Sequence, residues 1–164
     1  MDILTGFAPV AEPDARLLIL GSMPGVASLE ATQYYAYPRN AFWKIMGDLF
    51  APGLEMDYRA RLQLLAKNHI ALWDVVKSCR RPGSLDSAIA ADGLVINDFE
   101  SFFKQHPRIN RVFFNGQKAA GLFTKRVAPG LGGRFEYTTL PSTSPAYAAK
   151  RYADKLEAWS VIRR

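Results

Sequence analysis

Four short segments carry side chains that could perform chemistry, and the first is the turn Gly21–Gly25. It follows an apolar run, Leu17–Leu20, which suits a buried strand. Ligands of parallel α/β folds bind beyond the carboxyl ends of the strands, so this turn is expected to line a site. It lacks the Lys-Ser/Thr ending of a phosphate-binding Walker loop and the third glycine of a dinucleotide fingerprint. Neither a nucleoside triphosphate nor a dinucleotide is therefore predicted.

The second segment belongs to a long connection, Gly21 to Pro38, that holds Tyr34, Tyr35 and Tyr37 and is followed by Asn40. Connections longer than about 12 to 15 residues in a compact domain are usually functional. Tyrosines there could stack on planar bases, each worth about 1 to 3 kcal/mol, although packing is the commoner role of any single tyrosine. Asn40 either caps the helix that follows or holds a water molecule.

The third segment presents a carboxylate, Asp74, at the end of the apolar run Ile70–Val76. A carboxylate at a strand end could accept hydrogen bonds from ring N–H groups of a base. Capping of a local turn is an alternative of nearly equal weight. Asn115 stands just before Gly116 at the tip of another apolar run and is assigned mainly to the turn there.

The fourth segment, Leu140–Pro145, gathers three hydroxyl side chains at an expected helix start. Helix starts bind anions, so Ser142 and Ser144 are candidate phosphate contacts, with Lys150 and Arg151 farther along the same basic segment. Ser144 could equally serve only as the N-cap, with Pro145 in the first turn.

Alternating periods of apolar residues predict the elements that must position these segments. Strand-like runs alternate with helical stripes, which is typical of an α/β protein with a mostly parallel sheet and helices on both faces. A capping box of Asn97 and Glu100 opens one expected helix. The expected strands are Leu17–Leu20, Ile70–Val76, Val112–Phe114 and Phe135–Leu140, and the expected helices are Ala41–Phe50, Tyr58–Ala66, one after Asn97, one after Gly116 and one from near Pro145.

Length and composition narrow the classes of protein. The 164 residues, 49% hydrophobic and 22% charged, suit one globular domain over residues 1–164. A single cysteine, Cys79, and two histidines exclude an intrachain disulfide and leave few ligands for a metal. No apolar run approaches the roughly 20 residues of a membrane span, and the first residues are acidic where a signal peptide is basic. We therefore expect a cytoplasmic protein that binds no membrane and no metal.

The net charge of +6 is concentrated in the last part of the chain. Residues 1–117 hold 12 basic and 12 acidic side chains, whereas residues 118–164 hold 9 basic and 3 acidic ones. This surplus indicates either a polyanionic partner or a basic terminal helix that aids solubility, and charge alone weights the two equally.

Together the four segments resemble the uracil-DNA glycosylase superfamily, and most closely its hypoxanthine-DNA (deoxyinosine) glycosylase branch. The likeness runs from about Leu17 to Arg151. It implies a three-layer αβα sandwich over a four-stranded parallel sheet, without a cofactor, that excises a deaminated base from damaged DNA. The segments that carry the resemblance are Gly21–Gly25, Tyr35–Trp43, Leu72–Asp74 and Leu140–Pro145.

The resemblance also assigns roles to residues. Several sister branches carry a catalytic Asp or Asn where this sequence has Met23, whose thioether cannot act as a base. In the hypoxanthine branch the key asparagine corresponds to Asn40, the stacking aromatic to Tyr35 and the base-edge contact to Asp74. The implied base-binding residues are Ser22, Met23, Tyr35 and Asp74, and the implied DNA contacts are Pro24, Gly25, Ser142, Ser144, Pro145 and Lys150, with Tyr147 as the bulky residue where a wedge enters the duplex.

The leading hypothesis is a monofunctional DNA glycosylase of base excision repair, acting as a monomer on hypoxanthine or another deaminated base. A lyase step is not expected, because the Gly21–Pro38 loop has no lysine to form a Schiff base. One alternative is a nucleic-acid-binding module of the same fold that has lost catalysis, given Met23. Another is a hydrolase of small nucleotides.

Overall fold

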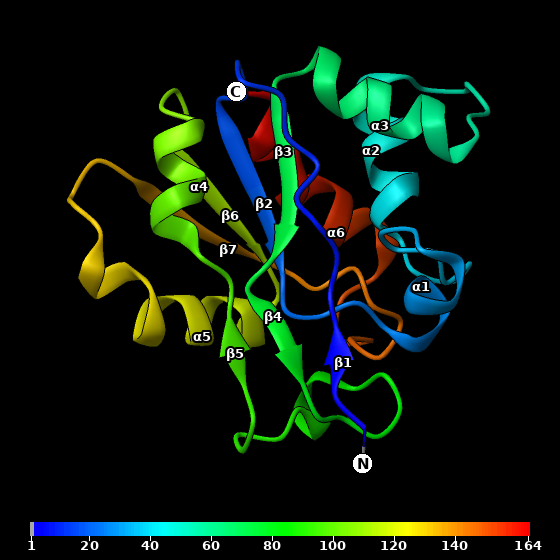
Figure 1. Cartoon of the computed structure of the whole chain (residues 1–164). Helices are drawn as coiled ribbons and strands as arrows, with labels where there is room; N and C mark the ends of the chain where they lie inside the picture. Colours follow the sequence, from blue (N-terminus) through cyan, green and yellow to red (C-terminus); the bar gives the residue numbers. More distant parts are fainter. Residues whose placement is uncertain (1) are drawn as a thin grey trace.

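The computed structural model describes residues 2–164 and is built around a four-stranded parallel sheet, as the sequence predicts. The strand order is β3-β2-β6-β7, and helices cover both faces (Figure 1). Gly21 pairs with Asp74 and Asn115 pairs with Leu140, so all four strands end at one edge, called here the carboxyl edge. The strands are β2 (Leu17–Gly21), β3 (Ile70–Asp74), β6 (Arg111–Asn115) and β7 (Glu136–Leu140).

Two separate apolar clusters fill the space on either side of this sheet. Strand β2 shows why, because all five of its residues are buried and its side chains point alternately to opposite faces. Leu18 and Leu20 join one cluster, whereas Leu17 and Ile19 join the other. The predicted three-layer αβα sandwich is thereby confirmed.

Three helices cover one face and two cover the other. Phe42, Leu65 and Trp159 bring α2, α3 and α6 to one cluster, while Phe99 and Phe123 bring α4 and α5 to the other. In the described chain, no helix is long and apolar enough to cross a membrane. The helices are α1 (Val26–Ala31), α2 (Phe42–Phe50), α3 (Tyr58–Lys67), α4 (Phe99–Gln105), α5 (Gln117–Arg126) and α6 (Tyr152–Trp159), with 3₁₀ turns η1 (Asp86–Ala88), η2 (Ala128–Gly130) and η3 (Ser160–Arg163).

A second, three-stranded antiparallel sheet lies beyond the carboxyl edge (Figure 1). Its strands are β1 (Leu4–Thr5), β4 (Val76–Cys79) and β5 (Val95–Ile96), in the order β1-β4-β5. The apolar run expected as one strand is therefore two, since β3 ends at Asp74 and β4 begins after Val75. Periodicity alone could not detect this break, because apolar residues continue through it.

The expected start of the last helix near Pro145 is wrong. Helix α6 begins at Tyr152 with Arg151 as its N-cap residue. Ser144 instead closes a tight turn, because its carbonyl accepts the N–H of Tyr147 at 3.0 Å. Ser144 and Pro145 are frequent in turns as well as at helix starts, so their types do not distinguish the two structures.

Two further local expectations differ from the structure. The N-cap of α4 is Asp98, whose carboxylate accepts the N–H of Ser101, while Asn97 donates its side-chain N–H to the carbonyl of Asp74 at 2.8 Å. The long Gly21–Pro38 connection also contains a short helix, α1. Asn97 therefore positions the end of β3 rather than a helix.

The fold predicts that Trp159 stabilises the protein by a buried hydrogen bond. Its fully buried indole donates its N–H to the carbonyl of Pro141 at 2.9 Å. Trp159→Phe keeps most of the ring but leaves that carbonyl without its donor. The free energy of unfolding in urea should fall by about 1 to 3 kcal/mol. Tyr137→Phe, at a more exposed ring, is the control and should change it by less than about 0.5 kcal/mol; equal stability of both variants would contradict the role.

Candidate active site

The centre of the site is Gly21, where β2 and β3 end side by side. A Cβ atom at this position would lie 2.5 Å from Asp74 Oδ1 and 2.8 Å from the hydroxyl oxygen of Tyr35. Both distances are too short for any side chain, so only glycine allows the carboxyl and the phenol to approach this point. The sheet therefore brings Tyr35 and Asp74 together.

The carboxyl of Asp74 is buried and incompletely satisfied. The residue is 4% exposed, and its Oδ2 has no hydrogen-bond partner among residues 2–164. Burial, reinforced by the charge of Asp86 and opposed by Arg81, raises the pKa of Asp74 to about 7. This carboxyl can therefore be protonated or ionised near neutral pH, and its buried Oδ2 lacks a hydrogen-bond partner within residues 2–164.

Two residues that sequence analysis missed hold the Gly21–Gly25 turn from the connection between β4 and β5. Arg81 is 3% exposed and donates to the carbonyls of Pro24 and Gly83, at 2.6 and 2.8 Å. Asp86 accepts a hydrogen bond from the hydroxyl of Ser22. The available signal was the pair of arginines, Arg80 and Arg81, directly after β4; nothing comparable marks Asp86.

The Gly21–Gly25 turn presents backbone donors rather than a catalytic side chain. The N–H groups of Ser22 and Met23 have no acceptor within residues 2–164. The side chain of Met23 is buried against Val76, Cys79 and Ile89, so its thioether serves packing. Gly25 is the N-cap residue of α1.

The tyrosines of the long connection have different environments. Tyr34 is 3% exposed and donates its hydroxyl to the carbonyl of Ala8, so it belongs to the core, whereas Tyr37 is exposed. Tyr35 has a φ of +53°, unusual for a residue with a side chain, and its ring stacks on Phe42 at 4.2 Å between centroids. Its hydroxyl is buried without a partner among residues 2–164. Burial, with the nearby Asp74 charge, raises the pKa of Tyr35, which therefore stays neutral.

Asn40 lies half-buried at the start of α2. Its Oδ1 accepts the N–H of Phe42 at 3.0 Å, as a cap would. Its Nδ2 has no acceptor in the part of the chain described, so capping leaves half of the carboxamide available. The next residue, Ala41, donates its N–H to the carbonyl of Thr143 at 3.0 Å, which brings Asn40 beside the loop after β7.

Asn115 attaches the loop after β7 to the sheet. Its Oδ1 accepts the N–H of Thr143 and its Nδ2 donates to the Thr143 hydroxyl, both at 2.9 Å. The following Gly116 has a φ of +96°, and a Cβ there would lie 3.2 Å from that of Ser142. The assignment of Asn115 to its local turn is therefore wrong, because its buried carboxamide binds a distant loop.

The hydroxyl groups of Ser142 and Ser144, in this loop, accept hydrogen bonds but donate none among residues 2–164. Ser142 Oγ accepts the N–H of Ser144 at 3.1 Å, and Ser144 Oγ accepts the N–H of Ala146 at 3.2 Å. Neither hydroxyl donates to an acceptor among residues 2–164. Lys155 donates to the carbonyls of Ser144 and Tyr147, at 3.3 and 2.8 Å, and holds the loop from α6.

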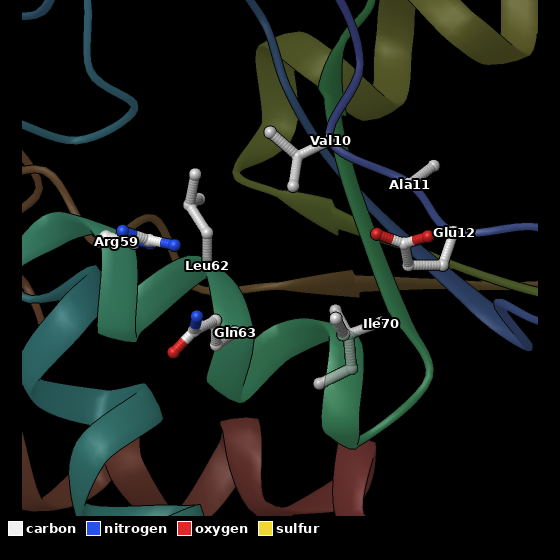
Figure 2. A pocket seen from close by; sticks show the side chains of 8 residues that line it. Val10, Ala11, Glu12, Arg59, Leu62, Gln63 and Ile70 are labelled. Atoms are coloured by element: carbon white, nitrogen blue, oxygen red, sulfur yellow. The ribbon is translucent and has the colours of Figure 1, made fainter.

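The structure thus brings most of the predicted residues to the carboxyl edge, and Lys150 is exposed at the end of the same loop, just before α6. Among the described residues, no group of three or more His, Cys, Asp or Glu is arranged to hold a metal. A separate cavity of about 270 Å³ lies at the start of β3, the opposite end of the sheet (Figure 2). The residues at the carboxyl edge are Ser22, Met23, Pro24, Gly25, Tyr35, Asn40, Asp74, Ser142, Ser144 and Pro145.

An αβα sandwich with buried polar groups at the carboxyl edge of its sheet is the architecture of an α/β protein that binds a ligand at that edge. Comparison with known proteins identifies the family. The profile of the Uracil DNA glycosylase superfamily matches residues 8–163. The chain belongs to this superfamily.

Individual relatives are similar over most of the chain. The hypoxanthine DNA glycosylase of Methanosarcina acetivorans is 36% identical over 99% of both chains. That of Methanosarcina barkeri is 39% identical over 70% of this chain and 72% of its own. A solution NMR structure from Methanosarcina acetivorans, assigned to the uracil DNA glycosylases, superposes with a TM-score of 0.80 at 35% identity and covers 99% of this chain and 98% of its own.

The raised pKa of Asp74 predicts a pH dependence of stability. The folded state binds this proton more tightly than the unfolded chain. The stabilisation that protonated Asp74 contributes is therefore complete below pH 4 and is lost as pH rises to about 7. Asp74→Asn carries no titrating proton, so its melting temperature should fall less than that of the wild type between pH 5 and pH 8. The control Asp98→Asn removes an exposed carboxyl whose pKa lies below its ordinary value and should behave like the wild type in this range. Parallel curves for all three proteins would contradict the assignment.

Proposed function

We propose that this chain is a monofunctional DNA glycosylase that hydrolyses the N-glycosidic bond of a flipped deaminated base, with hypoxanthine as the leading substrate. The observation that carries the proposal is the buried Asp74 carboxyl, whose Oδ2 has no partner among residues 2–164, close to the Ser22 and Met23 N–H groups, which have no acceptor in the same range. Relatives named hypoxanthine DNA glycosylase, one similar over 99% of both chains, support the substrate. The protein would act as a monomer in the cytoplasm, without a cofactor.

Recognition of the base follows from its hydrogen-bonding edge. Asp74 accepts the N1–H of hypoxanthine, and the N–H groups of Ser22 and Met23 donate to its carbonyl oxygen. Adenine has no proton at N1 and carries an amino group in place of that carbonyl, so it leaves these groups unpaired, which is costly in a buried site. Tyr35 stacks on the flipped base, and flipping itself costs least where the base is mispaired.

The chemical step needs geometry more than a strong base. Positive charge builds on the sugar as the bond breaks, and the phosphates of the DNA stabilise that charge. Asn40 orients one water molecule toward C1′ through its carboxamide. Met23 takes no part in proton transfer, because its buried thioether is not a base.

The DNA backbone is held by the loop after β7 and by the Gly21–Gly25 turn. Ser142 and Ser144 donate their free hydroxyl protons to phosphate oxygens, beside Pro145, and exposed Lys150 adds charge. Hydroxyl groups of a loop, not the N–H groups of a helix start, therefore bind the phosphates, since α6 begins only at Tyr152. Pro24 and Gly25 line the opposite side, and Tyr147 enters the duplex.

End-labelled duplexes containing deoxyinosine, uracil or a mismatched thymine, treated with alkali after incubation, test the activity by revealing abasic sites. Asn40→Ala should lower single-turnover excision about 100-fold while DNA affinity stays nearly constant, because the water loses its orientation. Asn40→Asp keeps the oxygen that caps α2 and separates this effect from loss of the cap.

Asn68→Ala, at the end of α3, is the control and should excise like the wild type. Tight binding without abasic sites would identify an inactive binding module. Unchanged turnover in Asn40→Ala would exclude its role with water.

The double variant Ser142→Ala, Lys150→Ala tests the DNA-binding face. Loss of one cationic phosphate contact should reduce the slope of log affinity against log salt by about 1 and weaken binding to all sequences. Lys104→Ala, near the end of α4, serves as the matched lysine control. If the slope is the same in both variants, the DNA lies on another surface.

A further inference from the structure

Arg81 is the charged residue beside the site that the proposed function leaves without a role. It follows β4 and is 3% exposed, so its guanidinium lies inside the protein. Nη2 donates to the carbonyl of Pro24 at 2.6 Å, and Nε donates to that of Gly83 at 2.8 Å. Nη1 is buried without a hydrogen-bond partner among residues 2–164, and no ion pair in this range includes Arg81. A buried cation is costly unless an anion compensates it.

We propose that Arg81 is a positioning residue of excision, which fixes the turn that holds the base and whose buried charge stabilises the negative charge of the departing base. This inference rests on the proposed function and adds a further residue to the same reaction.

The backbone of the turn after β2 shows which way its donors point. A trans peptide group directs its C=O and its N–H to opposite sides, and no cis peptide bond occurs in the described chain. The carbonyls of Gly21 and Ser22 accept the N–H groups of Val75 and Val76, at 2.9 and 3.0 Å. The N–H groups of Ser22 and Met23 belong to the same two peptides, so they point away from the segment that begins β4.

Arg81 anchors the same turn farther along, at the carbonyl of Pro24. It comes from the chain that follows β4, as the two backbone anchors come from the chain that begins it. Its guanidinium therefore approaches the turn from the carbonyl side. In the proposed complex the N–H groups of Ser22 and Met23 face the base on the other side, so a buried positive charge lies behind the donors that hold the base.

The chemical step creates the anion that this charge lacks. As the N-glycosidic bond breaks, its electron pair goes to the base, and water supplies the oxygen that joins C1′ and a proton that the base takes up after leaving. The negative charge of the departing base is shared by the carbonyl oxygen that the turn binds. Because the base is neutral before the bond breaks, a nearby cation stabilises the transition state more than the bound substrate. Burial of Arg81 limits the screening of its field by water and salt.

Two substitutions separate the charge of Arg81 from its hydrogen bonds. Arg81→Gln keeps an N–H donor for a carbonyl but removes the charge, whereas Arg81→Lys keeps the charge. Single-turnover excision from a deoxyinosine duplex should fall about 10- to 100-fold in Arg81→Gln, and Arg81→Lys should be at least about 5-fold faster than Arg81→Gln. Affinity for a duplex with 2′-fluoro-deoxyinosine, which resists excision, should change by less than about 3-fold in both variants, because its base carries no developing charge.

Arg80→Gln is the matched control. Arg80 is the neighbouring arginine, paired with the exposed Asp92 at 3.4 Å, and its variant should match the wild type in rate and affinity. Unfolding in urea shows whether each variant folds. If Arg81→Gln does not fold, Arg81→Lys decides the question: a rate within about 10-fold of the wild type at unchanged affinity supports the inference, and a greater loss contradicts it.

The outcomes separate the inference from the function it rests on. Absence of abasic sites in every duplex treated with the wild type would remove the proposed function and the inference together. Excision by Arg81→Gln at the wild-type rate would overturn the inference alone. Equal losses of rate in Arg81→Lys and Arg81→Gln, or losses of affinity as large as those of rate, would also overturn it, because Arg81 would then only shape the turn.

Discussion

The site depends on the close approach of two strand ends at Gly21. Because this residue has no side chain, the Asp74 carboxyl and the Tyr35 hydroxyl occupy the space beside its backbone. The same approach buries Asp74, which raises the pKa of its carboxyl and leaves Oδ2 without a partner in the described part of the chain. A larger residue at position 21 would displace both groups, so the parallel pairing of β2 and β3 creates the chemistry of the site.

The surrounding loops are ordered by side chains that donate to, or accept from, backbone groups. Arg81 holds the Gly21–Gly25 turn, Asn115 holds Thr143, and Lys155 holds the rest of the loop after β7. Each of these side chains comes from a different part of the chain and is largely buried. Because the loops are held before any ligand arrives, little ordering remains to be completed when DNA binds. The same residues satisfy backbone groups that would otherwise be buried without partners.

Local sequence predicted the sheet well, because its strands are apolar runs whose length and spacing leave few alternatives. The same reasoning failed at Ser144 and at Asn97, where a polar residue could serve a helix start or another partner. Short polar side chains bind whichever backbone group lies within reach, so their role depends on the neighbouring loop. The second sheet was missed because Val75 continues the apolar pattern through the point where β3 gives way to β4.

By itself, the sequence determined the αβα architecture, its four parallel strands and the four segments at the carboxyl edge that match one superfamily. Those features depend on residues close together in the sequence, so the spacing of apolar residues and the positions of turn residues are enough to predict them. Only the tertiary structure decided that Tyr34 packs in the core while Tyr35 faces Asp74, and that Arg81 and Asp86 adjoin a turn about sixty residues earlier. The charge state of a buried carboxyl depends on which groups surround it in space, and no local pattern contains that information.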